Sequence, residues 1–221
     1  MRMRRKRRLE SRIEECEHLI IRNPEDLCGR WLEKFKYDDL IFDELHVELG
    51  CGKGLFTVET AKLEPDVLYI GIEMITNVLI LALERADKTG LQNLLFINKP
   101  ADDLSMFFAP GEVSRIYINF CDPWPANRHK KRRLTGTHFL EIYKQILCPG
   151  GEIHFKTDNF PLFEFSLAEF KQNGFNLSDI TYDLHENGPA IIMTDYEIKF
   201  HEQGKPIYKC IIVTEGVKAQ G

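Results

Sequence analysis

Three glycines stand at every second position, at Gly50, Gly52 and Gly54, directly after the short apolar run Val47–Leu49. Glycines at the end of a strand let the backbone approach a bound ligand closely. A dinucleotide-binding fingerprint would need a glycine at Leu55, and a phosphate-binding P-loop would need Ser or Thr after a Gly-Lys pair, so neither pattern fits. Two interpretations remain: a turn that binds another nucleotide-like ligand, and a tight turn without a ligand.

Two carboxylates flank this turn in the sequence. Glu48 precedes the glycines and completes an E-x-G-x-G-x-G pattern, which is typical of S-adenosylmethionine-dependent methyltransferases. Glu73 follows the apolar run Val67–Ile72, 19 residues after Gly54. A carboxylate can accept hydrogen bonds from both vicinal hydroxyls of a ribose. We therefore expect Glu73 to bind a ribose and Glu48 to face the positive charges of the cofactor. A helix-capping role is the alternative for Glu73.

A third carboxylate, Asp122, follows the strand-like run Arg115–Phe120 and precedes Pro123 and Trp124. An acid beside a planar aromatic at a strand end suits a flat heterocycle. The basic run Arg128–Arg133 follows and would overhang the same pocket, where it would attract phosphates. A solvated basic loop is the alternative.

Two further segments are polar. Asp158 follows another strand-like run and either joins the site or caps the helix expected from Phe160. The run Thr194–Phe200 offers a hydroxyl, acids and aromatic rings, although by pattern alone it is a polar loop. The histidines have no metal-ligand spacing, so we expect no metal.

The elements that must position these residues alternate along the chain. Strand-like runs precede helical-period segments, which indicates βαβ units. We therefore predict a Rossmann-like, doubly wound α/β fold with a mainly parallel sheet, helices on both faces and an antiparallel edge strand in Pro206–Thr214. The strand and helix pairs are Val47–Leu49 with Leu55–Leu63, Val67–Ile72 with Val78–Ala86, Leu94–Ile97 alone, Arg115–Phe120 with Phe139–Leu147, and Glu152–Phe155 with Phe160–Phe170.

Charge and composition bound the organisation. The 221 residues hold 29 basic and 34 acidic ones, but positions 1–8 and 128–133 carry eleven of the basic residues, and the remainder has a net charge of −16. Such concentrated positive charge suits a polyanionic partner. We expect a basic tail and helical arm over residues 1–36, with a helix in Leu9–Ile21, and one methyltransferase domain over 37–221. Six cysteines without a CxxC pair indicate a reduced, cytoplasmic protein, and no apolar stretch indicates a membrane partner.

With these residues together, the chain resembles the bacterial tRNA (guanine-N7)-methyltransferases over nearly its whole length. The resemblance implies transfer of a methyl group from S-adenosylmethionine to N7 of the variable-loop guanine of tRNA, position 46 in the usual tRNA numbering, which leaves S-adenosylhomocysteine. Five blocks in the family's order carry it: Glu48–Gly54, Gly71–Glu73, Asn119–Pro125 with Arg128–Leu134, His154–Asn159 and Thr194–Phe200.

The resemblance also implies individual roles. Asp122 is the expected catalytic residue, and it contacts the cofactor together with Glu48, Gly50, Gly52, Glu73, Pro100 and Ala101. The expected substrate-binding residues are Ala126, Arg128, Lys130, Lys131, Asp158, Thr194, Asp195, Tyr196 and Glu197.

Two positions depart from the family pattern. Pro100 stands where the family usually has an acid or amide that reaches the adenine, so the amide of Ala101, with help from Asn98 or Asp102, would read that base. Ala126 stands where a lysine is common, and the phosphate contact would pass to the cations of the basic run.

Other functions stay open from the sequence. An N6-adenine or N4-cytosine methyltransferase has a similar pocket motif, but the single proline before Trp124 and the basic run argue against it. A non-catalytic tRNA-binding module is the other alternative, and the protein is expected to be a monomer or a homodimer.

Overall fold

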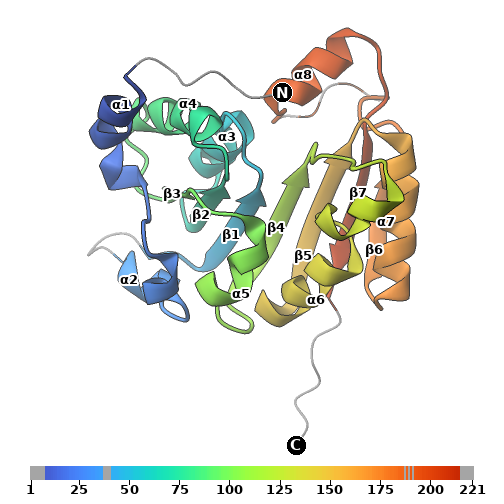
Figure 1. Ribbon diagram of the computed structural model, residues 1–221, viewed down its shortest axis with the longest axis horizontal. Coiled ribbons are helices and arrows are strands. Elements are labelled where there is room, and N and C mark those ends of the chain that lie inside the picture. Colours follow the sequence, from blue (N-terminus) through green and yellow to red (C-terminus); the bar gives the residue numbers. More distant parts are fainter. Residues whose placement is uncertain (1–7, 37–40, 187, 189, 191, 215–221) are drawn as a thin grey trace, which may run out of the picture.

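The computed structural model describes residues 8–36, 41–186, 188, 190 and 192–214. Its centre is a seven-stranded sheet with the strand order β3-β2-β1-β4-β5-β7-β6 (Figure 1). The strands are β1 (Glu44–Leu49), β2 (Val67–Ile72), β3 (Leu94–Ile97), β4 (Val113–Asn119), β5 (Leu147–Thr157), β6 (Asn176–Thr181) and β7 (Tyr208–Val213).

Helices cover both faces of this sheet, and two apolar clusters fill the space between them. One cluster holds buried residues of α3 and α4, with α1 packed against it, and the other holds residues of α5, α6 and α7 (Figure 1). The α-helices are α1 (Leu9–Glu15), α2 (Trp31–Lys34), α3 (Leu55–Leu63), α4 (Thr76–Asp87), α5 (Leu104–Phe107), α6 (Thr137–Ile146), α7 (Phe160–Gln172) and α8 (Asp195–Glu202). The predicted doubly wound α/β fold is confirmed.

The register of the parallel strands brings four carboxyl ends to one edge. Leu49 at the end of β1 is paired with Ile72 of β2 and with Ile118 of β4, and Ile118 is paired with Phe155 of β5. Ligands of open α/β sheets bind outside this edge, next to the point where the strand order reverses. The edge lies at the top of Figure 1, where α8 is also found.

The antiparallel strand predicted in Pro206–Thr214 is confirmed as β7, which pairs antiparallel with β5 and with β6. It lies inside the sheet, because β6 forms the edge. The sequence pattern did not predict β6. All its side chains are exposed or half-buried, so apolar residues do not recur on one face as they do in a strand that covers a core.

The N-terminal segment packs against the sheet. The helix expected over Leu9–Ile21 ends earlier, at Glu15, and a 3-10 turn, η1 (Glu17–Leu19), follows it. The chain turns there because Leu19 is buried in the core and Ile20 forms a parallel bridge to Phe96 of β3. The domain boundary expected after residue 36 falls beside residues 37–40, outside the described part of the chain.

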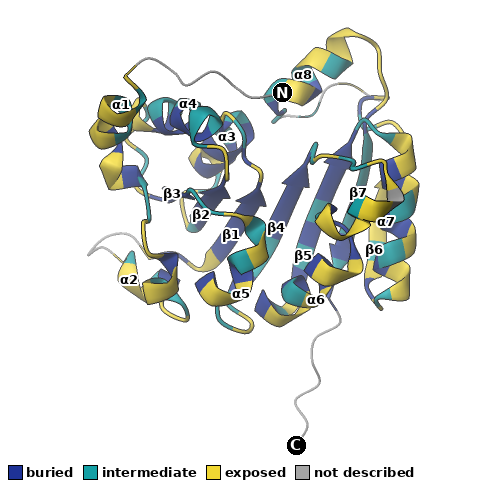
Figure 2. Cartoon of the chain, viewed as in Figure 1, coloured by how far each residue is buried: buried dark blue, intermediate teal, exposed yellow. Residues whose placement is uncertain are grey.

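Burial follows the layers, as Figure 2 shows: strands are mostly buried and the outer faces of the helices are exposed. Several charged side chains are buried as well, namely those of Glu48, Glu73, Arg133, Lys156 and Glu197. Burying a charge costs free energy unless the charge is paired or hydrogen-bonded. We therefore expect each of these side chains to have a polar partner inside the protein. No helix among the described residues is long and apolar enough to cross a membrane.

Candidate active site

The glycine turn joins β1 to α3 in a conformation that glycine adopts without strain. Gly50, Gly52 and Gly54 have φ angles of 71°, 60° and 74°, in the left-handed region. A Cβ atom on Gly54 would lie 2.6 Å from Cβ of Ala82, so α4 packs directly on the turn. A Cβ atom on Gly50 would meet no atom within 4 Å, so the turn is open on that side.

Glu73 ties this turn to the end of β2. One carboxylate oxygen accepts the amide of Gly52 at 3.3 Å, and the other accepts the amide of Ile75 at 2.8 Å. Burial raises the pKa of Glu73. The two amides lower it, the negative charge of Asp122 raises it, and both effects are smaller than that of burial. The N-cap residue of α4, Ile75, makes no side-chain cap, and its amide donates to Glu73, so Glu73 also contacts the start of this helix.

Asn98 holds the main chain at Glu73. Its amide nitrogen donates to the carbonyl of Glu73 at 2.7 Å, and its amide oxygen accepts the hydroxyl of Thr76 at 2.7 Å. Both ends of this amide are therefore engaged, and each retains one further hydrogen-bonding position that an adenine could use. Asp102 is exposed and lies 3.8 Å from His138.

Glu48 lies beneath the turn, with 2% of its surface exposed. Its carboxylate accepts hydrogen bonds from the hydroxyl of Thr57 on α3 and, at 3.0 Å, from the amide of Asn119 on β4. Burial raises the pKa of Glu48 to about 7 despite these donors and the nearby positive charge of Lys156. The amide oxygen of Asn119 is buried without a partner among the described residues.

Asp122 is exposed, and among the described residues it forms no hydrogen bond or ion pair. Its charge contributes to the raised pKa of Glu73, so the two carboxylates lie within electrostatic range. Phe120 and Trp124 on either side have φ angles of 54° and 41°, which are uncommon for residues other than glycine. Such backbone outliers concentrate at functional sites.

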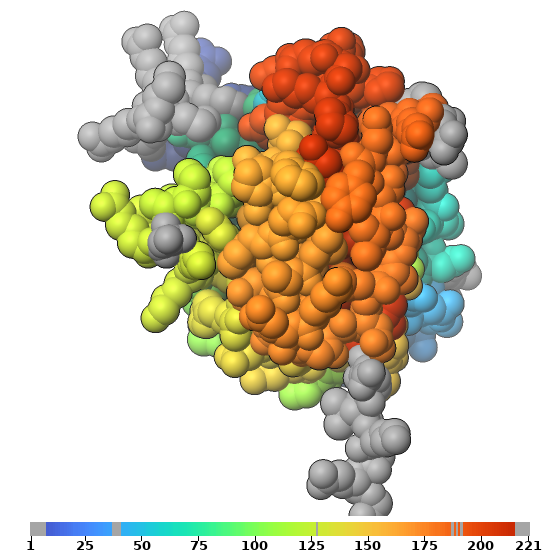
Figure 3. Space-filling model, turned by 90° about the vertical axis from the view of Figure 1, so that its right-hand side faces the viewer, coloured from blue at the N-terminus to red at the C-terminus, as the bar shows by residue number. Residues whose placement is uncertain are grey.

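The basic run forms a 3-10 turn, η4 (Asn127–Arg132), whose yellow-green segment projects from the body in Figure 3. Arg128, Lys130 and Lys131 are exposed, and a surface hollow runs from the two lysines to the start of α6. Arg133 is buried instead, so the run divides into outward-facing cations and one internal cation.

Asp158 follows β5 at the same edge and is half-buried. It does not cap α7, because Asn159 performs that role by accepting the amide of Leu162 at 2.9 Å. Among the described residues no hydrogen bond is formed by the Asp158 carboxylate, which leaves it available beside the site.

The segment expected as a polar loop by pattern forms the helix α8 (Asp195–Glu202). A capping box begins it: the hydroxyl of Thr194 accepts the amide of Glu197 at 2.9 Å, and the carboxylate of Glu197 accepts the amide of Thr194 at 3.4 Å. The T-x-x-E spacing is a known signal for such a helix start, and it was present in the sequence.

Glu197 fastens α8 to the sheet. It is fully buried, and one of its oxygens accepts a hydrogen bond at 3.0 Å from the ammonium of Lys156, a residue near the end of β5. Its other oxygen lies 3.2 Å from Nε2 of His185, without hydrogen-bond geometry. The Lys156 ammonium also lies 5.1 Å from the ring centroid of Phe56 on α3. Sequence reasoning missed Lys156 and His185, which only the folded chain brings together.

Two residues in the first turn of α8, Asp195 and Tyr196, contact other residues at the carboxyl edge of the sheet. Asp195 forms an ion pair with Arg85 of α4, at 3.1 Å. The Tyr196 side chain is 58% exposed, and its ring is stacked with that of Phe120, with centroids 6.4 Å apart. Helix α8 therefore spans the strand ends from β5 to α4 (Figure 1).

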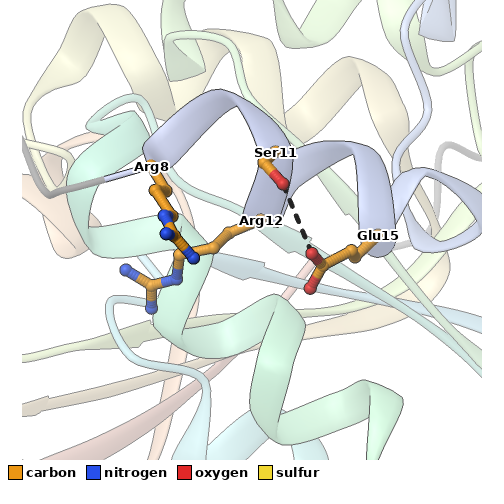
Figure 4. Close-up of a pocket in the computed structure, with 4 residues that line it drawn as sticks. All are labelled: Arg8, Ser11, Arg12 and Glu15. Atoms are coloured by element: carbon orange, nitrogen blue, oxygen red, sulfur yellow. Dashed lines mark hydrogen bonds between the residues drawn. The ribbon is translucent and has the colours of Figure 1, made fainter.

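A separate hollow lies on α1, lined by Arg8, Ser11, Arg12 and Glu15 (Figure 4). Arg12 is already engaged there by Glu84 of α4, at 2.5 Å. None of the predicted site residues lines this hollow, so the carboxyl edge of the sheet remains the candidate active site.

Comparison with known proteins identifies similar methyltransferases. A family model described as "Putative methyltransferase" matches residues 43–210. A tRNA (guanine-N(7)-)-methyltransferase of Geobacillus kaustophilus (strain HTA426) is 48% identical over 211 residues, which cover 95% of this chain and 95% of the relative.

This chain belongs to the tRNA (guanine-N7)-methyltransferase family. Solved structures share its fold at lower identity. The 16S rRNA methyltransferase KamB is 16% identical with a TM-score of 0.61, over 79% of this chain and 89% of that one. A SAM-dependent methyltransferase from Aquifex aeolicus is 13% identical with a TM-score of 0.55, over 90% of this chain and 97% of that one.

The two departures from the family pattern lie at the starts of short turns. Pro100 is exposed and precedes η3 (Ala101–Asp103), and Ala101 is half-buried. Ala126 is exposed and precedes η4. In both places the first amide of a 3-10 turn follows, and such amides have no partner within their own turn.

Proposed function

We propose that this protein transfers the methyl group of S-adenosylmethionine to N7 of the variable-loop guanine, position 46, of tRNA. One observation carries the proposal: the carboxylates of Glu73 and Asp122 lie within electrostatic range of each other near an open glycine turn and an exposed basic loop, in a member of this family.

The residues at the edge fit the cofactor. The open side of Gly50 leaves space for a ligand against the backbone, and the Glu73 carboxylate beside Gly52 suits a ribose. Glu48, held by Thr57 and Asn119, would face the cationic end of the cofactor. The amide of Ala101 would read the adenine in place of the side chain that Pro100 lacks. S-adenosylmethionine supplies an electrophilic methyl group on a positively charged sulfur.

Guanine N7 carries a lone pair and no proton, so its attack needs no general base. The protein's main task is to hold the base in line, which contributes through proximity and orientation. Positive charge develops on the purine as N7 becomes methylated. Asp122, and after it Asp158, would stabilise that charge and accept hydrogen bonds from the N1-H and N2-H groups of guanine, which selects guanine over adenine.

Substrate contacts divide between the basic loop and α8. Arg128, Lys130 and Lys131 are exposed and would bind phosphates. They would also supply the phosphate contact of the lysine that is common in the family where this chain has Ala126. On α8, Asp195 and Tyr196 are the members that reach the surface of the site. Thr194 and Glu197 act on guanosine through the capping box that places these two residues.

The decisive experiment incubates the protein with unmodified tRNA and labelled S-adenosylmethionine and then maps the methylated nucleoside. We expect 7-methylguanosine at position 46. Label in N6-methyladenosine or N4-methylcytidine would support the alternative methyltransferases instead. Binding of tRNA without any transfer or any cofactor binding would support the non-catalytic module.

Cofactor affinity should depend on pH through Glu48, whose pKa is raised to about 7. The ionised carboxylate attracts the cationic cofactor, so affinity falls as pH falls through the pKa. Between pH 7.5 and 6.5 the ionised fraction drops about threefold, and we expect a similar rise in the dissociation constant.

Calorimetry at the two pH values measures this effect, and Glu48→Gln is the matched control because it keeps the shape and cannot titrate. The substitution also distinguishes titration of Glu48 from titration of Glu73, because the pKa of Glu73 is raised as well. An equal pH dependence in the Gln variant would assign the effect to another group.

Exposed cations of the basic loop should set the salt dependence of tRNA binding. Replacing Arg128, Lys130 and Lys131 together by glutamine should weaken binding and reduce the slope of log K against log salt by somewhat under one unit per lost phosphate contact. Binding is measured at several salt concentrations, with cofactor affinity as the control. A slope equal to that of the wild type would mean that tRNA enters by another surface.

A further inference from the structure

Arg133 differs from the other cations of the basic run because its guanidinium points into the protein. Its surface is 8% exposed, whereas Arg128, Lys130 and Lys131 face solvent. The guanidinium donates to the carbonyl of Pro123 at 3.0 Å and to that of Trp124 at 2.9 Å. It also stacks on a ring of α7. A guanidinium held in this way is directed at the main chain of residues 123 and 124, and little of it is exposed to a tRNA phosphate.

The ring beneath this guanidinium is that of Phe165, whose centroid lies 4.2 Å from the guanidinium carbon. Arginine suits such a place better than lysine, because its planar fork donates to two acceptors at fixed spacing and stacks on an aromatic face. Lysine would bring its donors on a single nitrogen, which reproduces neither the spacing of the guanidinium fork nor its planar stacking. The contact therefore depends on the shape of the side chain as well as on its charge.

The two carbonyls that Arg133 binds come directly after Asp122. Trp124, which carries one of them, has a φ of 41°, in the left-handed region. A residue other than glycine remains in this conformation only when surrounding contacts hold it there. Arg132 and His129 pack against the Trp124 ring. Arg133 supplies the hydrogen bonds to the main chain, so it fixes the direction in which the chain leaves Asp122.

The main chain of Arg133 is also fixed. Its amide donates to the carbonyl of Lys130 at 3.1 Å, and its carbonyl accepts the amide of Gly136 at 2.9 Å. A Cβ atom on Gly136 would lie 3.2 Å from that carbonyl oxygen, so the turn is tight. With its side chain on residues 123 and 124, Arg133 closes the loop from 123 to 133 into a ring that presents the remaining cations outward.

We infer that Arg133 is a positioning residue for methyl transfer: it holds the turn after Asp122 so that this carboxylate faces the guanine, and it does not bind tRNA phosphates. The inference rests on the proposed function of Asp122. It assigns the basic run two separate tasks, phosphate binding by its exposed members and alignment of the catalytic turn by Arg133.

The test compares Arg133→Lys and Arg133→Gln with Arg128→Gln. Both Arg133 variants should lower the single-turnover rate at saturating tRNA about fivefold to tenfold and should keep the wild-type salt slope of tRNA binding. Arg128→Gln should lower that slope by somewhat under one unit. A wild-type rate in Arg133→Lys, or a reduced slope in the Arg133 variants, would overturn the inference.

A second measurement does not depend on activity. The chain has two tryptophans, and Trp31 is fully buried, so acrylamide quenching of the fluorescence reports on Trp124. Without tRNA or cofactor, quenching should rise about twofold in the Arg133 variants and stay unchanged in Arg128→Gln. Equal quenching in all variants would refute the inference.

The two readouts also separate the inference from the proposed function. A wild-type protein that methylates no guanine contradicts the proposed function, while the quenching comparison still decides whether Arg133 holds the turn. Should Arg133→Gln not fold, Arg133→Lys keeps the charge and most of the stem, and it carries the test alone.

Discussion

Replacing Asp122 by asparagine should lower the single-turnover rate of methyl transfer by about 100-fold, which corresponds to about 2.7 kcal/mol in the barrier. The amide keeps the shape of the side chain but cannot offset the positive charge that develops on the purine. We expect tRNA affinity to change little, because the proposed phosphate contacts come from the exposed cations of the basic loop. Rapid-quench assays with labelled cofactor and saturating tRNA measure the rate.

Structure supplies the control for this variant. Asp122 is exposed and has no hydrogen-bond partner among the described residues, so its substitution should leave the melting temperature unchanged. A loss of rate then cannot be assigned to unfolding. A single-turnover rate within threefold of the wild type would show that the electrostatic role belongs elsewhere, with Asp158 as the next residue to test.

Glu73→Ala should raise the dissociation constant of the cofactor tenfold or more. Each charge-assisted hydrogen bond to a ribose hydroxyl is worth about 1.5 to 3 kcal/mol before water compensates for its loss. In the wild type the amides of Gly52 and Ile75 donate hydrogen bonds to the Glu73 carboxylate. The substitution removes both bonds and so loosens the turn. Both effects weaken binding. Titration calorimetry with S-adenosylmethionine and with S-adenosylhomocysteine measures the change.

Glu73→Gln is the matched variant, because its amide oxygen can still accept one of these two amides while its charge is lost. We expect an affinity between those of the wild type and the Ala variant. Unchanged affinity in a folded Glu73→Ala protein would remove Glu73 from ribose binding and leave it the role of joining the turn to β2.

The parts of the fold that the sequence predicted are those where local pattern and burial agree. Val67–Ile72 and Leu94–Ile97 are buried or nearly so along their length, and their apolar runs match β2 and β3 residue for residue. Strand β6 was missed because an edge strand exposed to solvent has no apolar face to detect. Helix α8 was missed although its capping box was visible, because its remaining residues are mostly polar.

The same division holds for the site. Glu48, Glu73 and Asp122 could be placed at one edge from the sequence, because the carboxyl ends of parallel strands must meet there. Contacts between distant residues could not. No local pattern predicts that Lys156 would lie against Glu197, or that Arg133 would turn inward while its neighbours face solvent.

Helix α8 is held by β5 through Glu197 and by α4 through Asp195, so one element contacts both the half of the sheet that carries the glycine turn and the half that carries Asp158. A ligand on either half that favours this docked position of α8 also favours binding on the other half. Such coupling is reciprocal: cofactor must tighten tRNA binding by the same factor by which tRNA tightens cofactor binding. If both ligands favour the docked position of α8, release of either product would weaken binding of the other, and both ligands would exchange in one cycle.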